Sequence, residues 1–575
     1  MGTARLFSGL ERDPVRISGQ DVFCPAAMPA PPAERPDSKL RHTVYLIGGR
    51  CAGVKTMCIF CASTAGANSS LASAASLGRA RRHVNEAVAK KRKVPIRRAQ
   101  RRRRAGDTSI LGRSRPILIE PSWVLLCNEN DEFTLVKDHT VVVENDVITD
   151  VLPKRRSGRD RRVRAPGTIL LPGFISGHTH VAGGTVTRGI IEGGRNYGRP
   201  LELADSLDDA GLEAITAHNL AELLRSGCTT QVEMSMSLRQ VQSYVRVASQ
   251  WGVRGYPSAM VPGIGRLFDI WRRSDDQVLF DSVPASLAEI EQALDFGRQV
   301  NGSENGRIQS QMGVHATDTQ TPETMQAFAT AARELGNGIH MHLSQGPAET
   351  ETVRRLWGKR PAEWIDDFGF YDGPLFAAHL SGADLDLDPE ILRVNNATYA
   401  HSPSAGGAGG GTQPWPEMLA AGVNTNIGID THSNDHLENV KLAVLYGQAR
   451  YDLLAESGHP LARPTIWDAI RAVTINPANG LGRSDLGRIR PGAKADLITV
   501  DVTGLLVGSG AVPPEPLNNL LYAHGRCVRD VMIDGHFMVR KGSLVVDDEH
   551  RVIRDGGDAV TTIWEQLRVE GWFDQ

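Results

Sequence analysis

Short apolar runs alternate with amphipathic segments through most of this 575-residue chain, and few folds accommodate that alternation. From TILLPGFISGHTH at residues 168–180 onward, eight strand-like runs follow one another, separated by seven helical stretches. The helical stretches repeat apolar residues every three or four positions, and LEAITAHNLAELLRSG ends at Gly227, a typical helix stop. The pattern predicts an α/β fold in which eight parallel strands close into a (β/α)8, TIM-like barrel.

The segments before and after this alternation are rich in β-strand patterns. TVVVENDVITDV, residues 140–151, places two apolar runs around a polar turn, which predicts a hairpin. Strand-like patterns return in ADLITVDV, residues 495–502, and in VRDVMIDGHFMVRKGSLVV, residues 528–546. We expect the two β-rich segments to pair into one small β-sandwich domain beside the barrel.

The first part of the chain differs from the rest in charge. Up to Arg115 it holds 23 Lys and Arg against 7 Asp and Glu, although the whole chain has a net charge of −2. Its run AKKRKVPIRRAQRRRRAG is typical of a disordered basic tail, and only here would we expect nucleic acid to bind. Five parts follow from these patterns: a basic extension (1–115), the first part of the β domain (116–170), the barrel (171–485), the second part of the β domain (486–552) and a C-terminal tail (553–575).

Cysteine usage and apolar content bear on the compartment. The seven cysteines are scattered, and Cys58 and Cys61 form a lone CxxC without a second pair, which is a weak zinc signal. No stretch has the apolar density of a membrane span, so we expect no membrane partner. The interpretation is a cytoplasmic protein in a reducing environment.

Polar residues stand where the predicted barrel strands end, which is where barrel active sites form. Neutral imidazoles together with a carboxylate suit one divalent transition metal ion, with zinc as first choice and Fe, Co or Mn as alternatives. The strand-end residues are His178, His180, His315, His342, His379, His401 and Asp430.

The spacing of these residues limits which of them can share a metal. In GIHMHLS, His340 and His342 point to the same side of a strand, but His342 lies at the end and should reach the metal. His340 lies two residues deeper and is interpreted as a core residue or as a support behind the ligands. Asp430 on the last strand can close the ring beside the first strand.

Five motifs in order resemble the amidohydrolase superfamily: LPGFISGHTH, GVHATDTQTPE, HMHLSQGPAE, AAHLSG and NIGIDTHSN. Within it, they are most similar to the chlorohydrolase and aminohydrolase branch, which includes triazine hydrolases and nucleoside-type deaminases. GRSDLGRIRPGAKADLITVD resembles the C-terminal β signature of that branch. The resemblance runs from about residue 117 to about residue 546. Hydrolases of phenylurea and thiocarbamate herbicides are similar in general plan.

The resemblance implies roles for all of these strand-end residues except His401. One metal would be held by His178, His180, His342 and Asp430. Asp430 would also act as the proton carrier, His379 would hydrogen-bond the attacking water or the substrate oxygen, and His315 would line the substrate pocket. RIQSQMGVHA lacks the bridging lysine of binuclear relatives, so a mononuclear site is favoured. The resemblance also implies a small-molecule substrate and a homo-oligomer.

Gln345 departs from the pattern of this branch. Its deaminases carry a glutamate three residues after the strand-five histidine, where it relays protons. An amide donates and accepts hydrogen bonds but carries no proton at neutral pH. We therefore expect Gln345 to orient a substrate carbonyl or amide, with simple space filling as the alternative.

Two more side chains have open roles. Glu233, at the end of the second strand, could face the pocket or be purely structural. The glycine-rich loop SPSAGGAGGGTQPWPEM is expected to form a pocket wall, with Trp415 packing on a substrate or on the core.

Four functions are compared. The first is a metal-dependent hydrolase that cleaves a C–N bond of a small amide, urea or carbamate, because metal-activated water, Asp430 and His379 suffice for it. The second is an aminohydrolase or dechlorinase acting on an N-heterocycle, with another group supplying what Gln345 lacks. The third is a non-catalytic barrel scaffold, against which the complete ligand set argues. The fourth is nucleic-acid binding through the basic tail.

Overall fold

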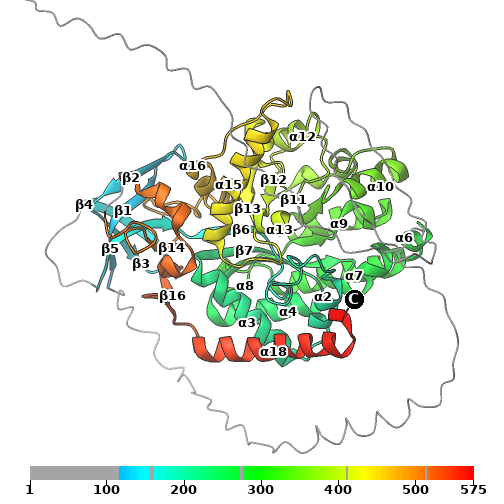
Figure 1. Cartoon of the computed structure of the whole chain (residues 1–575), viewed down its shortest axis with the longest axis horizontal. Coiled ribbons are helices and arrows are strands. Elements are labelled where there is room, and N and C mark those ends of the chain that lie inside the picture. The colour runs from blue at the N-terminus through cyan, green and yellow to red at the C-terminus, as the bar shows by residue number, and fades with distance from the viewer. Residues whose placement is uncertain (1–114, 154–160, 272–275, 409–411, 512–513, 575) are drawn as a thin grey trace, which may run out of the picture. The chain divides into compact units, whose positions relative to one another are not determined.

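The computed structural model describes residues 115–153, 161–271, 276–408, 412–511 and 514–574. Eight parallel strands form one sheet in chain order, and a bridge between Thr179 and Asp430 joins its first and last strands. The (β/α)8 prediction is therefore confirmed (Figure 1). The barrel strands are β6 (Phe174–Thr179), β7 (Cys228–Ser235), β8 (Arg254–Val261), β9 (Met312–Val314), β10 (Ile339–Leu343), β11 (Leu375–His379), β12 (Thr398–His401) and β13 (Asn424–Ile427).

Helices follow most barrel strands and cover the outside of the barrel. Glycine ends several of them: α4 stops before Gly252 and α9 before Gly336, both with positive φ. Thr321 occupies the N-cap position of α9 and Pro322 begins the helix, where its fixed φ is favourable. The longer helices are α2 (Gly198–Asp205), α3 (Asp209–Arg225), α4 (Leu238–Trp251), α5 (Ile264–Trp271), α7 (Val283–Val300), α9 (Pro322–Leu335), α10 (Pro347–Trp357), α15 (His436–Leu454) and α18 (Glu549–Val569).

A second sheet combines strands from before and after the barrel. Its order is β17-β16-β15-β14-β5-β1-β3-β4, and β2 pairs with β1. Figure 1 shows the early strands in blue to cyan beside the late strands in orange. The expected pairing of the two β-rich segments and the β3–β4 hairpin are confirmed. The strands are β1 (Ile117–Cys127), β2 (Phe133–Lys137), β3 (His139–Glu144), β4 (Val147–Pro153), β5 (Arg161–Pro172), β14 (Leu497–Asp501), β15 (Val528–Ile533), β16 (His536–Arg540) and β17 (Ser543–Leu544).

Only Gly173 separates β5 of the side sheet from β6 of the barrel. A Cβ at this position would lie 2.2 Å from Oγ1 of Thr229, so the two elements meet too closely for any other residue. The chain thus passes directly from the side sheet into the strand that carries the first histidines.

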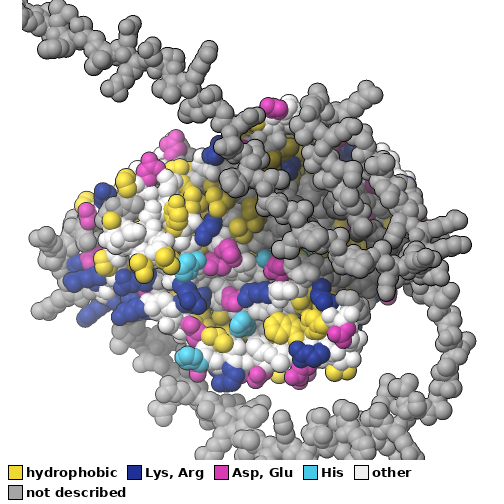
Figure 2. Space-filling model, in the orientation of Figure 1, with side chains coloured by type: hydrophobic (Ala, Val, Ile, Leu, Met, Phe, Trp, Pro, Cys, Tyr) yellow, Lys and Arg dark blue, Asp and Glu magenta, His cyan; other side chains and the backbone are white. Residues whose placement is uncertain are grey.

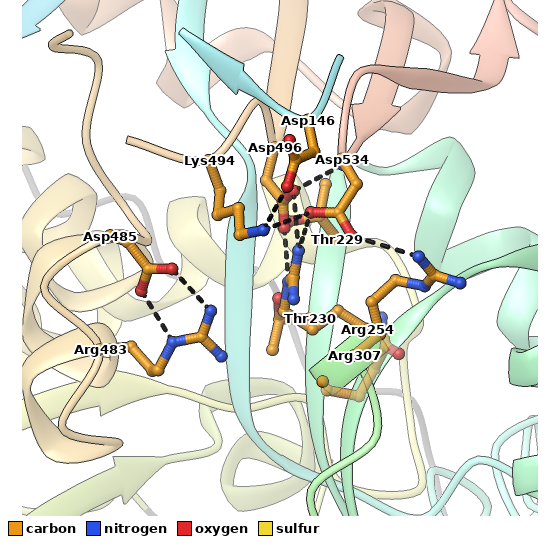
Figure 3. A network of polar contacts seen from close by, with 12 residues as sticks. Asp146, Thr229, Thr230, Arg254, Arg307, Arg483, Asp485, Lys494, Asp496 and Asp534 are labelled. Atoms are coloured by element: carbon orange, nitrogen blue, oxygen red, sulfur yellow. Dashed lines mark hydrogen bonds and ion pairs between the residues drawn. The ribbon is translucent and has the colours of Figure 1, made fainter. Parts of the chain in front are cut away.

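A buried ionic network joins the base of the barrel to the side sheet (Figure 3). Arg254, the first residue of β8, is 1% exposed. Its Nε donates to Asp496 at 2.8 Å and its Nη2 to Asp534 at 2.6 Å. Arg307 and Lys494 also reach Asp534, at 3.3 and 3.7 Å. A buried charge is tolerable only when it is paired in this way, so the network fixes the contact between barrel and sheet.

The C-terminal part is more ordered than a tail. Residues 553–575 were expected to form one, yet they contain most of α18, which packs on α3. Val552, Gly556, Val560, Ile563 and Leu567 recur at helical spacing on its buried face. Along its outer face, charges of both signs are interspersed (Figure 2).

The remaining predictions concern the chain as a whole. The basic segment at 1–115 and its nucleic-acid interpretation lie almost entirely outside the described residues. Cys127, Cys228 and Cys527 are free thiols. Within the described part of the chain, each helix is too short or too polar to cross a bilayer.

Candidate active site

Three histidines direct ring nitrogens toward one point at the mouth of the barrel. His178 and His180 come from the end of β6 and His342 from the end of β10. One ring nitrogen from each lies within 4.8 Å of the others. The Nε2 atoms of His180 and His342 are only 3.3 Å apart.

Backbone carbonyls fix the proton positions on two of these rings. Nδ1 of His180 donates to the Met234 carbonyl and Nδ1 of His342 to the His315 carbonyl, each at 2.5 Å. A carbonyl can only accept, so both protons sit on Nδ1 and both Nε2 atoms carry bare lone pairs. Two facing lone pairs at 3.3 Å repel unless a cation lies between them.

His340 supports the third ring from behind. Its Nε2 lies 2.8 Å from Nδ1 of His178, in a fully buried contact. The other nitrogen of His178, Nε2, has no hydrogen-bond partner. His340 thus contacts the ring of His178 on the nitrogen that is not near Asp430, and it belongs to neither group of candidate metal ligands.

Asp430 completes the site from beyond β13. Its Oδ1 lies 3.9 Å from Nε2 of His178 and 3.6 Å from Nε2 of His180. Its Oδ2 faces the other way, 3.8 Å from Nε2 of His379. The carboxylate thus has one oxygen toward the histidine cluster and one toward His379.

The donor set fits a divalent metal. Burial, reinforced by neighbouring histidines, holds the pKa of His178 and of His342 well below the usual value, and burial also lowers that of His180. The rings are therefore neutral at pH 7, with lone pairs available. Three imidazole nitrogens and a carboxylate oxygen around one point are the ligands that zinc prefers.

Gln413 determines which nitrogen of His379 carries a proton. Its Oε1 accepts the backbone N–H of Ser402 at 2.8 Å and lies 3.0 Å from Nδ1 of His401. The other end, Nε2, must then donate to Nδ1 of His379, at 3.1 Å. His379 consequently carries its proton on Nε2, beside Asp430. Sequence reasoning missed Gln413, since nothing in its glycine-rich loop distinguishes it.

A cavity of about 340 Å³ opens beside the cluster and is lined by His180, His315, His342, Gln345, His379 and Asp430 among others. The structure thus brings every candidate ligand and substrate-contacting residue together, except that His178 lies behind this lining. Nδ1 of His315 lies 3.0 Å from Oγ1 of Thr319. Burial lowers the pKa of His315 to about 3, so its ring is neutral.

Gln345 enters the cavity with an unsatisfied acceptor. Its Oε1 is buried and has no hydrogen-bond partner. The backbone N–H of Gln345 donates to Glu349 at 2.5 Å, and Glu349 also accepts the N–H of Thr317 at 3.0 Å. This buried carboxyl ties the loop after β10 to the loop after β9 and so fixes where the Gln345 amide stands.

Glu233 and Trp415 have structural contacts rather than a place in the cavity lining. Glu233 is fully buried and accepts hydrogen bonds from Thr179 and Ser235 side chains, at 2.6 and 2.8 Å, and from the backbone N–H of Val181. It therefore holds the strand that bears His178 and His180. Trp415 is fully buried and stacks on His401 with ring centroids 5.5 Å apart.

The backbone is strained at the strand ends. His379 has φ 78°, Asp430 φ 61° and Ser344 φ 46°, all in the left-handed region. Such conformations cost about 1–3 kcal/mol each in non-glycine residues and are typical of functional sites.

Fold and site together define a metal-dependent hydrolase of the TIM-barrel type. A model of the amidohydrolase family matches residues 169–538, and the chain belongs to this family. It is accordingly a hydrolase that acts on carbon–nitrogen bonds other than peptide bonds.

Similar proteins agree with this placement. A 5-methylthioadenosine/S-adenosylhomocysteine deaminase of Desulfitobacterium hafniense is 28% identical over 411 residues, 69% of this chain and 86% of that protein. A triazine hydrolase variant shares the fold with a TM-score of 0.65 at 21% identity, covering 78% of this chain and all of that one. An adenosine deaminase from Xanthomonas campestris, solved with bound zinc, has a TM-score of 0.63 at 23% identity, covering 78% and 98%.

Proposed function

We propose that this chain hydrolyses an amino-substituted N-heterocycle, releasing ammonia or an amine from a ring carbon. The observation that carries the proposal is the convergence of one ring nitrogen each from His178, His180 and His342, with Oδ1 of Asp430 3.9 and 3.6 Å from the first two. Relatives that match along most of their length are named as deaminases of adenine nucleosides, which supports a heterocyclic substrate. This replaces cleavage of an amide, urea or carbamate as the first choice.

In this proposal, His178, His180, His342 and Asp430 would hold one zinc ion. When bound, zinc supplies Lewis acidity and lowers the pKa of water, which provides a nucleophile at neutral pH. Oδ2 of Asp430 receives the proton of the attacking water and passes it to the departing nitrogen. The approach of this oxygen to Nε2 of His379, at 3.8 Å, supports that role.

In this proposal, His379 and His315 act on different parts of the substrate. With its proton on Nε2, His379 donates a hydrogen bond to the atom that gains negative charge at the reacting carbon. The neutral His315 lies on the cavity wall with its ring centroid 5.3 Å from that of His342, where it contacts the substrate ring.

Gln345 favours a second candidate function, hydrolysis of an amide, urea or carbamate. Its amide has no acidic proton to transfer at neutral pH, whereas deamination benefits from an acid that protonates the ring nitrogen. The free Oε1 of Gln345 is instead suited to accept an N–H beside the scissile bond. Cleavage of a urea then needs only Asp430 as proton carrier.

Leaving-group release by the zinc-loaded protein separates the two candidates. Ammonia release would be measured from aminopurines, aminopyrimidines and aminotriazines, and amine release from ureas, anilides and carbamates. Two variants sharpen the comparison: Gln345→Glu adds an acid and should increase ring deamination, whereas Gln345→Leu removes the acceptor of a substrate N–H and should reduce amine release. Gln448→Glu and Gln448→Leu are the matched controls, since Gln448 is also half-buried but lies in α15 and donates to Pro464.

The outcomes differ for each candidate. Ammonia release that increases in Gln345→Glu supports heterocycle deamination. Amine release that falls in Gln345→Leu and not in Gln448→Leu supports the second candidate. Absence of release from both panels, at full zinc occupancy, refutes both.

A further inference from the structure

The cavity beside the metal ligands offers almost no charge to a substrate. Of the described residues that line it, none is Lys, Arg or Glu, and the one aspartate is Asp430. The lining histidines are buried, and Asp430 is committed to the histidine cluster. The outer surface differs, since charges of both signs are common there (Figure 2). An ionised group of a substrate would therefore lose its water without gaining a partner, which is strongly unfavourable.

One wall of the cavity is a continuous apolar surface. Helix α5 turns Ile264, Leu267, Phe268 and Trp271 toward the cavity, and these positions repeat every three to four residues along one helix face. Side chains from neighbouring elements extend the same surface: Leu201, Met236 and Met260. All except Trp271 are at least 92% buried.

Trp271 forms the outer edge of this wall and is held in place. Its Nε1 donates to Asp318 at 3.1 Å, and its ring meets that of His315 edge to face, with centroids 5.5 Å apart. The ring is also 6.5 Å from that of Phe268. It is 43% exposed, so much of its surface is available to a ligand.

The neutral polar groups lie on the catalytic side. Gln345 offers its unpartnered Oε1 to the reacting portion of a substrate, whereas Gln413 is occupied by His379, His401 and Ser402. A bound molecule would thus have its C–N group at the histidines and its remaining bulk on the α5 wall. The volume of about 340 Å³ is near the lower end of the roughly 300–1,000 Å³ common for small-molecule pockets.

We propose that the cavity selects an uncharged substrate whose reacting C–N group carries a compact aryl, alkyl or thioalkyl substituent, and that it excludes substrates with a carboxylate or ammonium group. The proposal deepens the proposed function and rests on it for the position of the reacting bond. Of the two compounds named for the Desulfitobacterium relative, the proposal favours binding of 5-methylthioadenosine, which is neutral, over S-adenosylhomocysteine, which carries an amino-acid group.

Binding and hydrolysis would be measured separately on the zinc-loaded full chain, with matched probes. One pair is 5'-methylthioadenosine and S-adenosylhomocysteine; the other is 4-butylphenylurea and 4-ureidobenzoate. Dissociation constants come from calorimetry and hydrolysis from product release. For each pair in which binding is detected, we expect the neutral probe to bind at least about a hundredfold more tightly than the ionised probe, since an unpaired buried charge costs several kcal/mol. Each methylene added to the alkyl chain should improve binding about fourfold.

Substitutions at Trp271 test the wall itself. Trp271→Ala should weaken binding of 4-butylphenylurea or 5'-methylthioadenosine about tenfold, whereas Trp467→Ala should leave it unchanged. Trp467 is the matched control because it is 42% exposed and lies in α16 (Ile466–Ala472), outside this lining. Trp271→Arg should narrow the difference between 4-butylphenylurea and 4-ureidobenzoate by supplying a cation.

Each result bears on the proposal in one direction. A preference for the neutral probes that narrows about tenfold in Trp271→Ala supports it, and if nothing is hydrolysed in that case, the proposed function fails while the selectivity stands. Equal or tighter binding of the ionised probes overturns it. So does a preference that Trp271→Ala and Trp271→Arg both leave unchanged, because the α5 wall would then not be its source.

Discussion

Replacing Gln413 by glutamate would move the ring proton of His379 from Nε2 to Nδ1 while leaving the surrounding contacts nearly intact. A carboxylate keeps the two acceptor contacts to the Ser402 N–H and to His401, at 2.8 and 3.0 Å in the wild type. It cannot donate to Nδ1 of His379, as the amide does at 3.1 Å. The carboxylate would instead accept a hydrogen bond from a protonated Nδ1, and Nε2 of His379 would then carry no proton.

The size of the effect follows from what is removed. His379 would present a bare lone pair, not an N–H, to the atom that becomes negative at the reacting carbon. Loss of one such donor typically lowers kcat about 10²–10³-fold. KM should change far less, because the apolar side chains of α5 that line the cavity are untouched. We therefore expect Gln413→Glu to reduce kcat at least about a hundredfold.

The assay is steady-state product release by the zinc-loaded variant, with ¹⁵N NMR of labelled histidine to report which ring nitrogen of His379 is protonated. Gln231→Glu is the control for placing a carboxyl in the buried interior, because Gln231 is fully buried in β7 and contacts Tyr244. A Gln413→Glu enzyme that binds zinc normally and retains kcat within about threefold would refute the assignment of the His379 proton. So would an NMR spectrum in which the protonated nitrogen is unchanged.

Four further predictions concern the metal, its support, the barrel base and pH. Removing the metal with a chelator should abolish activity and lower Tm, and zinc should restore both; activity that survives complete metal removal, checked by elemental analysis, contradicts the site. His340→Ala should weaken zinc affinity about 10–100-fold by releasing the His178 ring, measured by competition with a chromophoric chelator. Arg254→Met should lower the free energy of unfolding by about 3–5 kcal/mol, because Asp496 and Asp534 lose a buried partner; urea titration showing a loss below 1 kcal/mol, on the scale of an exposed ion pair, would contradict this. Burial, together with Asp318, raises the pKa of Glu349 to about 8, above about 4.3 in an unfolded chain. Its contribution to stability is therefore complete at low pH and is lost as pH rises toward 8. Glu349→Gln should reduce the decline in the free energy of unfolding between pH 6 and 9, and an unchanged dependence of that free energy on pH would argue against this.

The fold and the ligand positions could be predicted from sequence because both depend on local periodicity. Strand ends are visible as apolar runs followed by His178, His342 or Asp430, and barrel closure places the last strand next to the first. The supporting position of His340 also follows from period-two alternation along β10. The apolar spacing of α18 was equally visible, but without a tertiary partner it does not distinguish a docked helix from a tail.

The roles of Gln413 and Glu233 could not be found in this way. Gln413 acts through the path of a glycine-rich loop, which no periodicity specifies. Glu233 was open between pocket and structure, and only the bulge between β6 and β7 shows that its carboxylate meets the N–H of Val181. The position of Gln345 could be recognised from the sequence. Its chemical role, however, depends on which reaction takes place, and side-chain geometry alone does not determine that.

The discontinuous side sheet has a consequence for synthesis on the ribosome. Pro172 of β5 pairs with Leu497 of β14, so the first half of the sheet is made 325 residues before the strand that completes it. At about 5–20 residues per second, this interval lasts about 16–65 s. During that time β5 presents an unpaired edge rich in leucine and isoleucine, the kind of surface to which chaperones bind. The nascent chain must therefore be protected until its C-terminal strands emerge.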